Sequence, residues 1–234
     1  MASSNTTNSK EAPRPSQRMR VAYILTLIGG YLDAYTYFER GGVFANAQTG
    51  NIVKLGIALA NGAHDAYLTY LIPICSFTLG LLFALGVKEY LERRELRLVR
   101  RSVLATEIVG LLAVSLIPLK DEWNLLANSI VSFVAAMQYE TFTTFRGEAI
   151  VTTMSTGNLR KMVDSLFDGI VHHDAAKLHR AGVFLSIIAT FTFGAFLGTR
   201  GCDALGRAAV LPAILALGTA ISIITALRSR NAAR

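Results

Sequence analysis

The sequence predicts an all-α, polytopic membrane protein with about six transmembrane helices. Hydrophobic side chains make up 52% of the 234 residues and charged side chains only 17%, and the mean hydropathy is +0.42. The apolar residues also form long blocks, several of which reach the roughly 20 residues that a helix needs to cross a bilayer. This composition excludes a disordered chain, which needs low hydrophobicity and high charge, and it argues against an ordinary soluble domain.

Six stretches have the length and hydropathy of a membrane span. They are residues 20–38, 66–87, 102–119, 123–143, 181–200 and 208–227. Two further apolar stretches, 41–61 and 147–167, are interrupted by Gly, Asn, Thr and charged residues. Because irregular backbone at membrane depth must be buried in protein or line a water-filled cavity, we expect both to be re-entrant segments. The polar residues 1–17 predict a short disordered cytoplasmic tail before a single transmembrane domain over 18–234.

Basic residues are distributed unequally between the two sides of this predicted topology. With the amino terminus in the cytoplasm, 18 of the 23 Lys and Arg residues fall in cytoplasmic segments. Cytoplasmic loops of membrane proteins carry such an excess, so we expect a multi-pass membrane protein with both termini in the cytoplasm. The same distribution accounts for the net charge of +7 without a nucleic-acid partner. Eight full spans would turn the basic cluster 88–101 outward, which the charges disfavour.

A Thr-Gly-Asn segment occurs twice, at 49–51 and at 156–158, with an offset of 107 residues. At this offset Asp33 aligns with Glu140, and the lysines that follow the two segments also align. The sequence therefore predicts two halves, about 20–119 and about 123–227, each ordered as span, broken segment, span, span. Because each half crosses the membrane three times, the second half is inverted, an arrangement common among secondary transporters.

Each Thr-Gly-Asn segment lies between a loop of small and polar residues and an apolar helix. Thr is a favourable helix N-cap and Gly allows a sharp turn, so we expect a half-helix to begin at each segment with Thr as its cap. The two N-termini would direct partial positive charge towards the middle of the membrane, which suits a small polar or anionic solute. Alternatively, the segments could be structural caps of packed hairpins.

Three charged residues lie inside the predicted spans: Asp33, Glu107 and Glu140. An ionisable group at membrane depth is costly and is by default a functional-site hypothesis. We predict that the aligned pair Asp33 and Glu140 binds a proton or a coupling cation. Alternatively, they could bond backbone N–H groups freed by the helix breaks, or lie shallow enough in the membrane to meet water. Glu107 has no counterpart in the other half, which favours a structural role for it.

The candidate solute- and ion-binding residues belong to the two motif segments and to polar positions near them. They are Asp33, Asn46, Thr49, Gly50, Asn51, Lys54, Gln138, Glu140, Thr153, Thr156, Gly157, Asn158 and Lys161. The sequence contains no GxSxG, HExxH, Walker A or GxGxxG motif, so we expect neither an enzyme nor a bound cofactor, and the histidines lack metal-ligand spacing. The expected partners are the lipid bilayer and an unknown small solute. Gly194 and Gly198 could allow close helix packing within the chain or in a homo-oligomer.

Several motifs resemble one known family. They are GGYLDAYTY at 29–37, RGGVFANAQTGNIV at 40–53, AMQYETF at 136–142 and TTMSTGNLR at 152–160. In these motifs the chain resembles the YoaK family, also called domain of unknown function 1275, over nearly its whole length after the tail. The resemblance implies a bacterial inner-membrane protein with several spans, and it implies no particular substrate. Glu140 departs from the family pattern, in which an amide is common near that position.

Together these observations favour a secondary transporter of a small polar or anionic solute. The solute would bind at a midplane site between the two halves, which the transporter opens to each side in turn. Two alternatives stay open. The re-entrant segments could form the filter of a channel, or the protein could be a membrane scaffold or assembly factor that transports nothing.

Overall fold

The computed structural model describes residues 15–62, 64–92, 96–145 and 147–232. In this part of the chain all regular secondary structure is helical, apart from one isolated bridge between Phe145 and Glu148, so the predicted all-α class is confirmed. Most of the predicted tail lies outside the described residues, but its last three residues already belong to the first helix.

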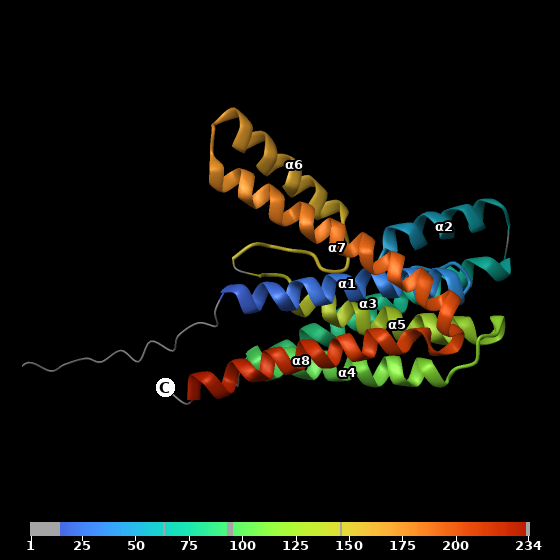
Figure 1. Ribbon diagram of the computed structural model, residues 1–234. Coiled ribbons are helices and arrows are strands. Elements are labelled where there is room, and N and C mark those ends of the chain that lie inside the picture. The colour runs from blue at the N-terminus through green and yellow to red at the C-terminus, as the bar shows by residue number, and fades with distance from the viewer. Residues whose placement is uncertain (1–14, 63, 93–95, 146, 233–234) are drawn as a thin grey trace, which may run out of the picture.

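The helices follow one another with short connections, except for two longer irregular loops (Figure 1). In chain order they are α1 (Pro15–Glu39), α2 (Gln48–Ala60), α3 (His64–Glu92), α4 (Leu96–Leu116), α5 (Asp121–Thr141), α6 (Thr156–Val171), α7 (Ala175–Leu205), the 3-10 helix η1 (Gly206–Val210) and α8 (Leu211–Ala232). The predicted spans correspond to α1, α3, α4, α5, α7 and α8. Each predicted broken segment is an irregular loop followed by a shorter helix, α2 or α6.

Several helices extend beyond the apolar blocks from which they were predicted. α3 continues to Glu92 and α7 begins at Ala175, because the backbone hydrogen-bond ladder continues through polar residues that hydropathy does not mark. α4 ends at Leu116, earlier than expected. Pro118 follows closely, and a proline disfavours helical backbone at the residue before it.

The two irregular loops begin at opposite ends of the helix bundle (Figure 1). The first loop, residues 40–47, begins where Arg40 bonds the carbonyl oxygen of Pro118, just after α4. The second loop, residues 142–155, begins where Phe142 lies under Arg100 near the start of α4, with 5.5 Å between the guanidinium carbon and the ring centroid. Each loop runs back towards the middle of the bundle before its short helix begins.

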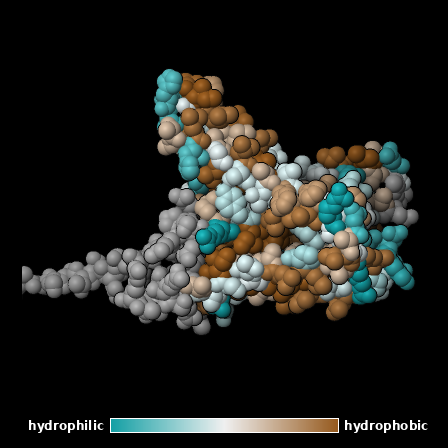
Figure 2. Space-filling model, in the orientation of Figure 1, coloured by the Kyte–Doolittle hydropathy of each residue, from teal (hydrophilic) through white to brown (hydrophobic). Residues whose placement is uncertain are grey.

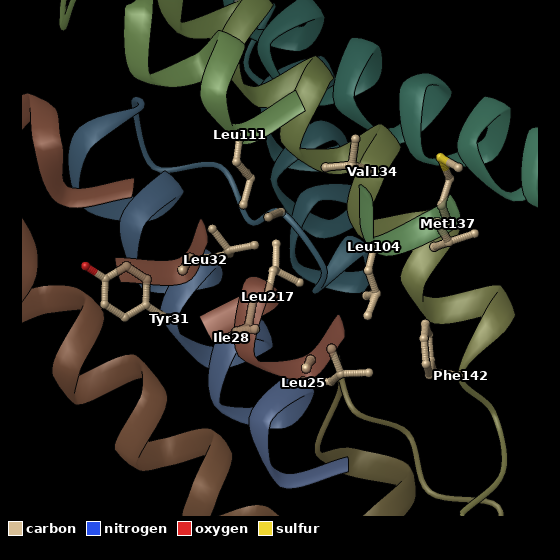
Figure 3. Close-up of a cluster of buried hydrophobic side chains, with 14 of the residues drawn as sticks. Leu25, Ile28, Tyr31, Leu32, Leu104, Leu111, Val134, Met137, Phe142 and Leu217 are labelled. Atoms are coloured by element: carbon tan, nitrogen blue, oxygen red, sulfur yellow. The ribbon is translucent and has the colours of Figure 1, made fainter. Parts of the chain in front are cut away.

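A shared core lies among α1, α4, α5 and α8. Figure 3 shows buried side chains of all four helices pointing towards one another, among them Leu25, Leu32, Leu104, Val134 and Leu217. α1 packs on α7 and α8, and α5 packs on α3 and α4. Close packing of these side chains holds the four helices together.

Gly194 and Gly198 both face α1 of the same chain. A Cβ atom on Gly194 would lie 2.2 Å from the carbonyl oxygen of Leu27, and one on Gly198 would lie 2.6 Å from that of Tyr31. Only glycine allows α7 to approach the α1 backbone this closely. This glycine face is therefore used within the chain.

The surface of the protein carries many large apolar side chains. Two helical stretches among the described residues, Ala66–Tyr90 and Ala175–Ala226, are long and apolar enough to cross a membrane, and only 22% and 33% of their most apolar windows are buried. Figure 2 shows apolar residues over the arm formed by α6 and the start of α7 and over α2, with hydrophilic residues at the bundle end and the arm tip. Exposed large apolar side chains occur on several helices, among them Phe83 on α3, Phe167 on α6 and Leu215 on α8. An exposed apolar surface of this kind is typical of a face that contacts a membrane or another protein. The predicted spans 66–87, 181–200 and 208–227 fall almost entirely within these two stretches, whereas 20–38, 102–119 and 123–143 do not meet the same criterion of length and hydropathy.

Candidate functional site

Asn51 holds the first loop against α2. Its side-chain oxygen accepts the backbone N–H of Phe44 at 3.0 Å, and its side-chain nitrogen donates to the carbonyl oxygen of Phe44 at 2.8 Å. Lys54, one turn further along α2, donates to the carbonyl oxygen of Gly42. Its ammonium group also lies 4.5 Å from the ring centroid of Tyr37. The loop is therefore fastened to the helix that follows it.

The second loop is held by the corresponding residues. Asn158 accepts the backbone N–H of Val151 at 3.2 Å and donates to the Val151 carbonyl oxygen at 2.6 Å. Lys161 donates to the carbonyl oxygen of Ala149. Every donor and acceptor here lies 107 residues after its counterpart in the first loop. Both asparagines thus satisfy backbone groups that irregular structure would otherwise leave without partners.

The prediction that Thr49 and Thr156 are helix N-caps is wrong. α2 begins at Gln48 after Ala47, and α6 begins at Thr156 after Ser155, with no side-chain hydrogen bond from either flanking residue to the helix N-terminus. Thr49 and Thr156 lie inside their helices and are exposed. The caps are not needed to hold the loops because the asparagine side chains already bond the loop backbone.

Asp33 fixes the point where the first loop turns into α2. Its carboxylate, only 5% exposed, accepts the backbone N–H of Asn46 at 2.7 Å and the side-chain amide of the same residue at 3.4 Å. The Asn46 amide also donates to the carbonyl oxygen of Gly29 at 3.0 Å. This is the backbone-bonding role given as the alternative for the aligned acids. Glu140 differs, since it is half-buried and its side chain forms no hydrogen bond or ion pair within the described residues.

One cavity of about 440 Å³ brings together the starts of both short helices. Four predicted site residues line it: Asp33, Thr49, Thr153 and Thr156. Its remaining wall is aromatic, aliphatic and hydroxylic, and is formed by Ala34, Tyr37, Phe38, Phe44, Ala47, Met154, Ser155, Phe191, Ala195 and Thr199. This volume and this mixture of apolar walls and a few polar groups are typical of small-molecule sites.

The other predicted site residues lie outside this cavity. Asn46, Asn51 and Asn158 are buried and bond the backbone, and Lys54 and Lys161 turn back to their own loops. The remaining four are Gly50, Gln138, Glu140 and Gly157, none of which lines the cavity. Among the described residues, no group of three or more His, Cys, Asp or Glu side chains could hold a metal ion.

Two buried polar residues were not predicted as part of the site. Arg40, which the predicted topology assigned to an outer loop, is fully buried and donates to the carbonyl oxygens of Pro118 at 2.7 Å and Ile117 at 3.0 Å. It thus satisfies carbonyl groups at the end of α4. Glu107 is 1% exposed, and the Gln138 amide nitrogen lies 3.1 and 3.2 Å from its carboxylate oxygens when it faces them. The sequence signal that could have added Glu107 to the candidate site was its position inside a predicted span.

Comparison with known proteins gives one family. No curated protein and no solved structure matches the chain. The family model described as protein of unknown function (DUF1275) matches residues 21–223, which include both loops, both short helices and the whole cavity wall. The chain therefore belongs to the DUF1275 family, as its loop motifs predicted.

Proposed function

We propose that this protein is a multi-pass secondary transporter of the inner membrane, and that a small polar or anionic solute binds in the cavity between the two loops. The observation that carries the proposal is that this cavity joins the start of α2 and the start of α6 with the buried acid Asp33. These two helix starts follow loops that begin at opposite ends of the bundle. A site between such elements is accessible from either side if the halves move against each other.

The distribution of charge supports a spanning orientation with both termini in the cytoplasm. Near the end of the bundle where α1 begins and α8 ends lie Arg20, Lys88, Arg100 and Arg101. The arm of α6 and α7 adds four further basic residues, which are Arg160, Lys161, Lys177 and Arg180. A basic excess of this kind is typical of the cytoplasmic side.

The pattern of helix contacts supports an inverted repeat. α1 packs on α7 while α5 packs on α3, and α1 packs on α8 while α5 packs on α4. Likewise α2 packs on α3 and α6 packs on α7. Exchanging the first four helices with the last four leaves these six contacts unchanged, as expected if the two halves are equivalent and opposed. The contact of α3 with α4 departs from this symmetry, since α7 meets η1 in place of α8 in the described part of the chain. The hydrogen bonds that recur at the 107-residue offset support the same equivalence.

The two helix starts present different chemistry to the solute. At the start of α2 the backbone N–H of Asn46 already donates a hydrogen bond to the carboxylate of Asp33. At α6 the flanking Ser155 side chain does not cap the N-terminus, and Thr153 and Thr156 line the cavity next to it. Free backbone N–H groups at a helix N-terminus favour an anion or a polar oxygen, so the solute binds at the α6 side.

The test is a thermal-shift screen on the detergent-purified full chain with formate, lactate, phosphate, glycerol and neutral amino acids. Binding to the folded state stabilises it, by about 2.7 kcal/mol at a solute concentration of 100 times Kd. The shift should disappear in Thr153→Val and Thr156→Val. Thr219→Val is the matched control, because Thr219 is exposed on α8 and lies outside the cavity.

Flux measurements then separate a transporter from a channel. Proteoliposomes loaded with the stabilising solute should show exchange that saturates and is accelerated by solute on the other side. Equal stabilisation of the wild type and both cavity variants, or a flux that never saturates, would contradict the proposal.

A further inference from the structure

Glu107 lies in the middle of α4 with its side chain inside the bundle. It is 1% exposed, and its only hydrogen-bond partner within the described residues is the amide of Gln138 on α5. The other end of this amide faces the hydroxyl of Thr152 in the second loop, 3.5 Å away. A neutral amide therefore stands between a buried acid and the loop.

Among the residues whose side chains the structure describes, the charged groups on the elements packed against α4 are Lys88 and Glu89 on α3, Asp121, Glu122 and Glu140 on α5, and Arg207 on η1, while α8 carries none up to Ala226. In the same part of the chain, α4 itself carries Arg100 and Arg101 in its first turns. Glu107 forms no ion pair with any of them. Its state thus depends on the proton and on Gln138.

The amide of Gln138 can reverse its orientation when Glu107 gains or loses a proton. When Glu107 is ionised, both its oxygens accept, so the amide nitrogen faces them and the amide oxygen accepts from Thr152. When a proton binds, the Glu107 hydroxyl donates to the amide oxygen. The amide is then reversed, and its nitrogen donates to the Thr152 hydroxyl oxygen. Thus one proton on Glu107 inverts the direction of the hydrogen bond at Thr152.

Thr152 is connected directly to the proposed solute cavity. Its carbonyl oxygen lies against α1, where a Cβ atom on Gly29 would be 2.8 Å from it. The next residue, Thr153, lines the cavity, and its buried hydroxyl has no hydrogen-bond partner among the described residues. A shift of Thr152 therefore moves the adjoining residue of the cavity wall, Thr153.

We propose that Glu107 is a proton-binding site, and that Gln138 and Thr152 transmit its protonation to the cavity wall at Thr153. The proposal rests on the proposed transport function, for which it identifies the coupling ion as the proton. It assigns this role to the acid without a counterpart in the other half. Asp33 remains the anchor of the first loop.

Infrared difference spectroscopy of the full-length protein, titrated from acidic to alkaline pH, measures proton binding directly. The wild type should lose a protonated-carboxyl band as the pH rises, and Glu107→Gln should lack this band while Asp33→Asn retains it. In Gln138→Leu the band should remain but shift in frequency, since the amide partner is gone. Retention of every pH-dependent carboxyl band in Glu107→Gln would overturn the proposal, and so would an unshifted band in Gln138→Leu.

Maleimide labelling measures transmission to the cavity. In a background of Cys75→Ser and Cys202→Ala, the labelling rate of Thr153→Cys is divided by that of Thr49→Cys, which lies on the α2 side of the same cavity. This ratio should change about fivefold or more with pH, and the change should vanish in Gln138→Leu and in Thr152→Val. A ratio that is independent of pH, or that changes equally in these variants, would overturn the transmission step. Neither measurement contains a solute, so this failure is distinct from a failure of solute binding.

Discussion

The carboxylate of Asp33 on α1 accepts the backbone N–H of Asn46 at 2.7 Å, where the first loop turns into α2. Asp33 and Asn46 are only 13 residues apart, but they belong to a helix and to the loop that folds back along it. A buried carboxylate thus takes the position that a bound anion would otherwise occupy at this helix start. The corresponding position near α6 is left open, because Glu140 makes no such bond.

Removing the Asp33 carboxylate should destabilise the fold. Asp33→Ala leaves the buried N–H of Asn46 without an acceptor, which costs about 1–3 kcal/mol. Chemical unfolding in detergent, followed by circular dichroism, measures the loss. Glu140→Ala is the matched control and should change stability little, since no bond depends on it. Equal losses in both variants would show that Asp33 does not anchor the loop.

The two loop asparagines should contribute similar stabilisation. Asn51→Ala and Asn158→Ala each remove two hydrogen bonds to one loop residue, so each should cost about 2–4 kcal/mol. Asn61→Ala, at the exposed residue after α2, serves as the control. Thermal unfolding of the three variants tests this. A large loss at only one of the two loops would argue against their equivalence.

The close helix contacts at Gly194 and Gly80 should not tolerate an added methyl group without a loss of stability. Gly194→Ala brings a Cβ within 2.2 Å of the Leu27 carbonyl oxygen, and Gly80→Ala brings one within 2.3 Å of that of Phe133. Each should destabilise by about 1–3 kcal/mol through overpacking. In Gly218→Ala the new Cβ meets nothing within 4 Å, so this control should be neutral or stabilising by about 1 kcal/mol or less. Melting temperatures that do not separate the two groups would contradict the close approach.

Arg40 should be required for the end of α4 to remain ordered. Arg40→Met preserves much of the buried volume but leaves the carbonyl oxygens of Ile117 and Pro118 without their donor, at a cost of about 2–4 kcal/mol. Arg40→Lys should restore part of this, because an ammonium group cannot reach all the acceptors of a planar guanidinium. Lys120→Met, at an exposed position, is the control. Hydrogen exchange at α4 in the three variants provides the measurement.

The helices and the repeated motif could be predicted because each depends on a short continuous stretch of sequence. Apolar blocks place the long helices, and the identical Thr-Gly-Asn segments place the two short ones. The two predicted lysine positions also correspond in the structure. Their side chains turn to Gly42 and Ala149, however, because the direction of a long side chain depends on where the loop carbonyls lie.

What could not be predicted depends on contacts between distant segments. Hydropathy treats Arg40 as an exposed loop charge, whereas the unpaired carbonyl groups at the end of α4 make its burial favourable. Glu107 was set aside because it has no aligned partner, yet its surroundings are made by Gln138 on another helix. Likewise, the threonine caps were wrong because Asn51 and Asn158 reach back seven residues to hold the loops.

The packing of α1 on α7 limits how early α1 can reach its final packing during synthesis of the chain. Tyr23 and Ser186, which share a hydrogen bond of 2.7 Å between these helices, are 163 residues apart. Since a chain is synthesised from its amino terminus, α1 emerges long before the helix that covers it exists. Until α7 has been synthesised, the backbone at Gly30 lacks Phe191 and Ala195, against which it packs in the folded protein, and a chain truncated before α7 would leave this face of α1 uncovered.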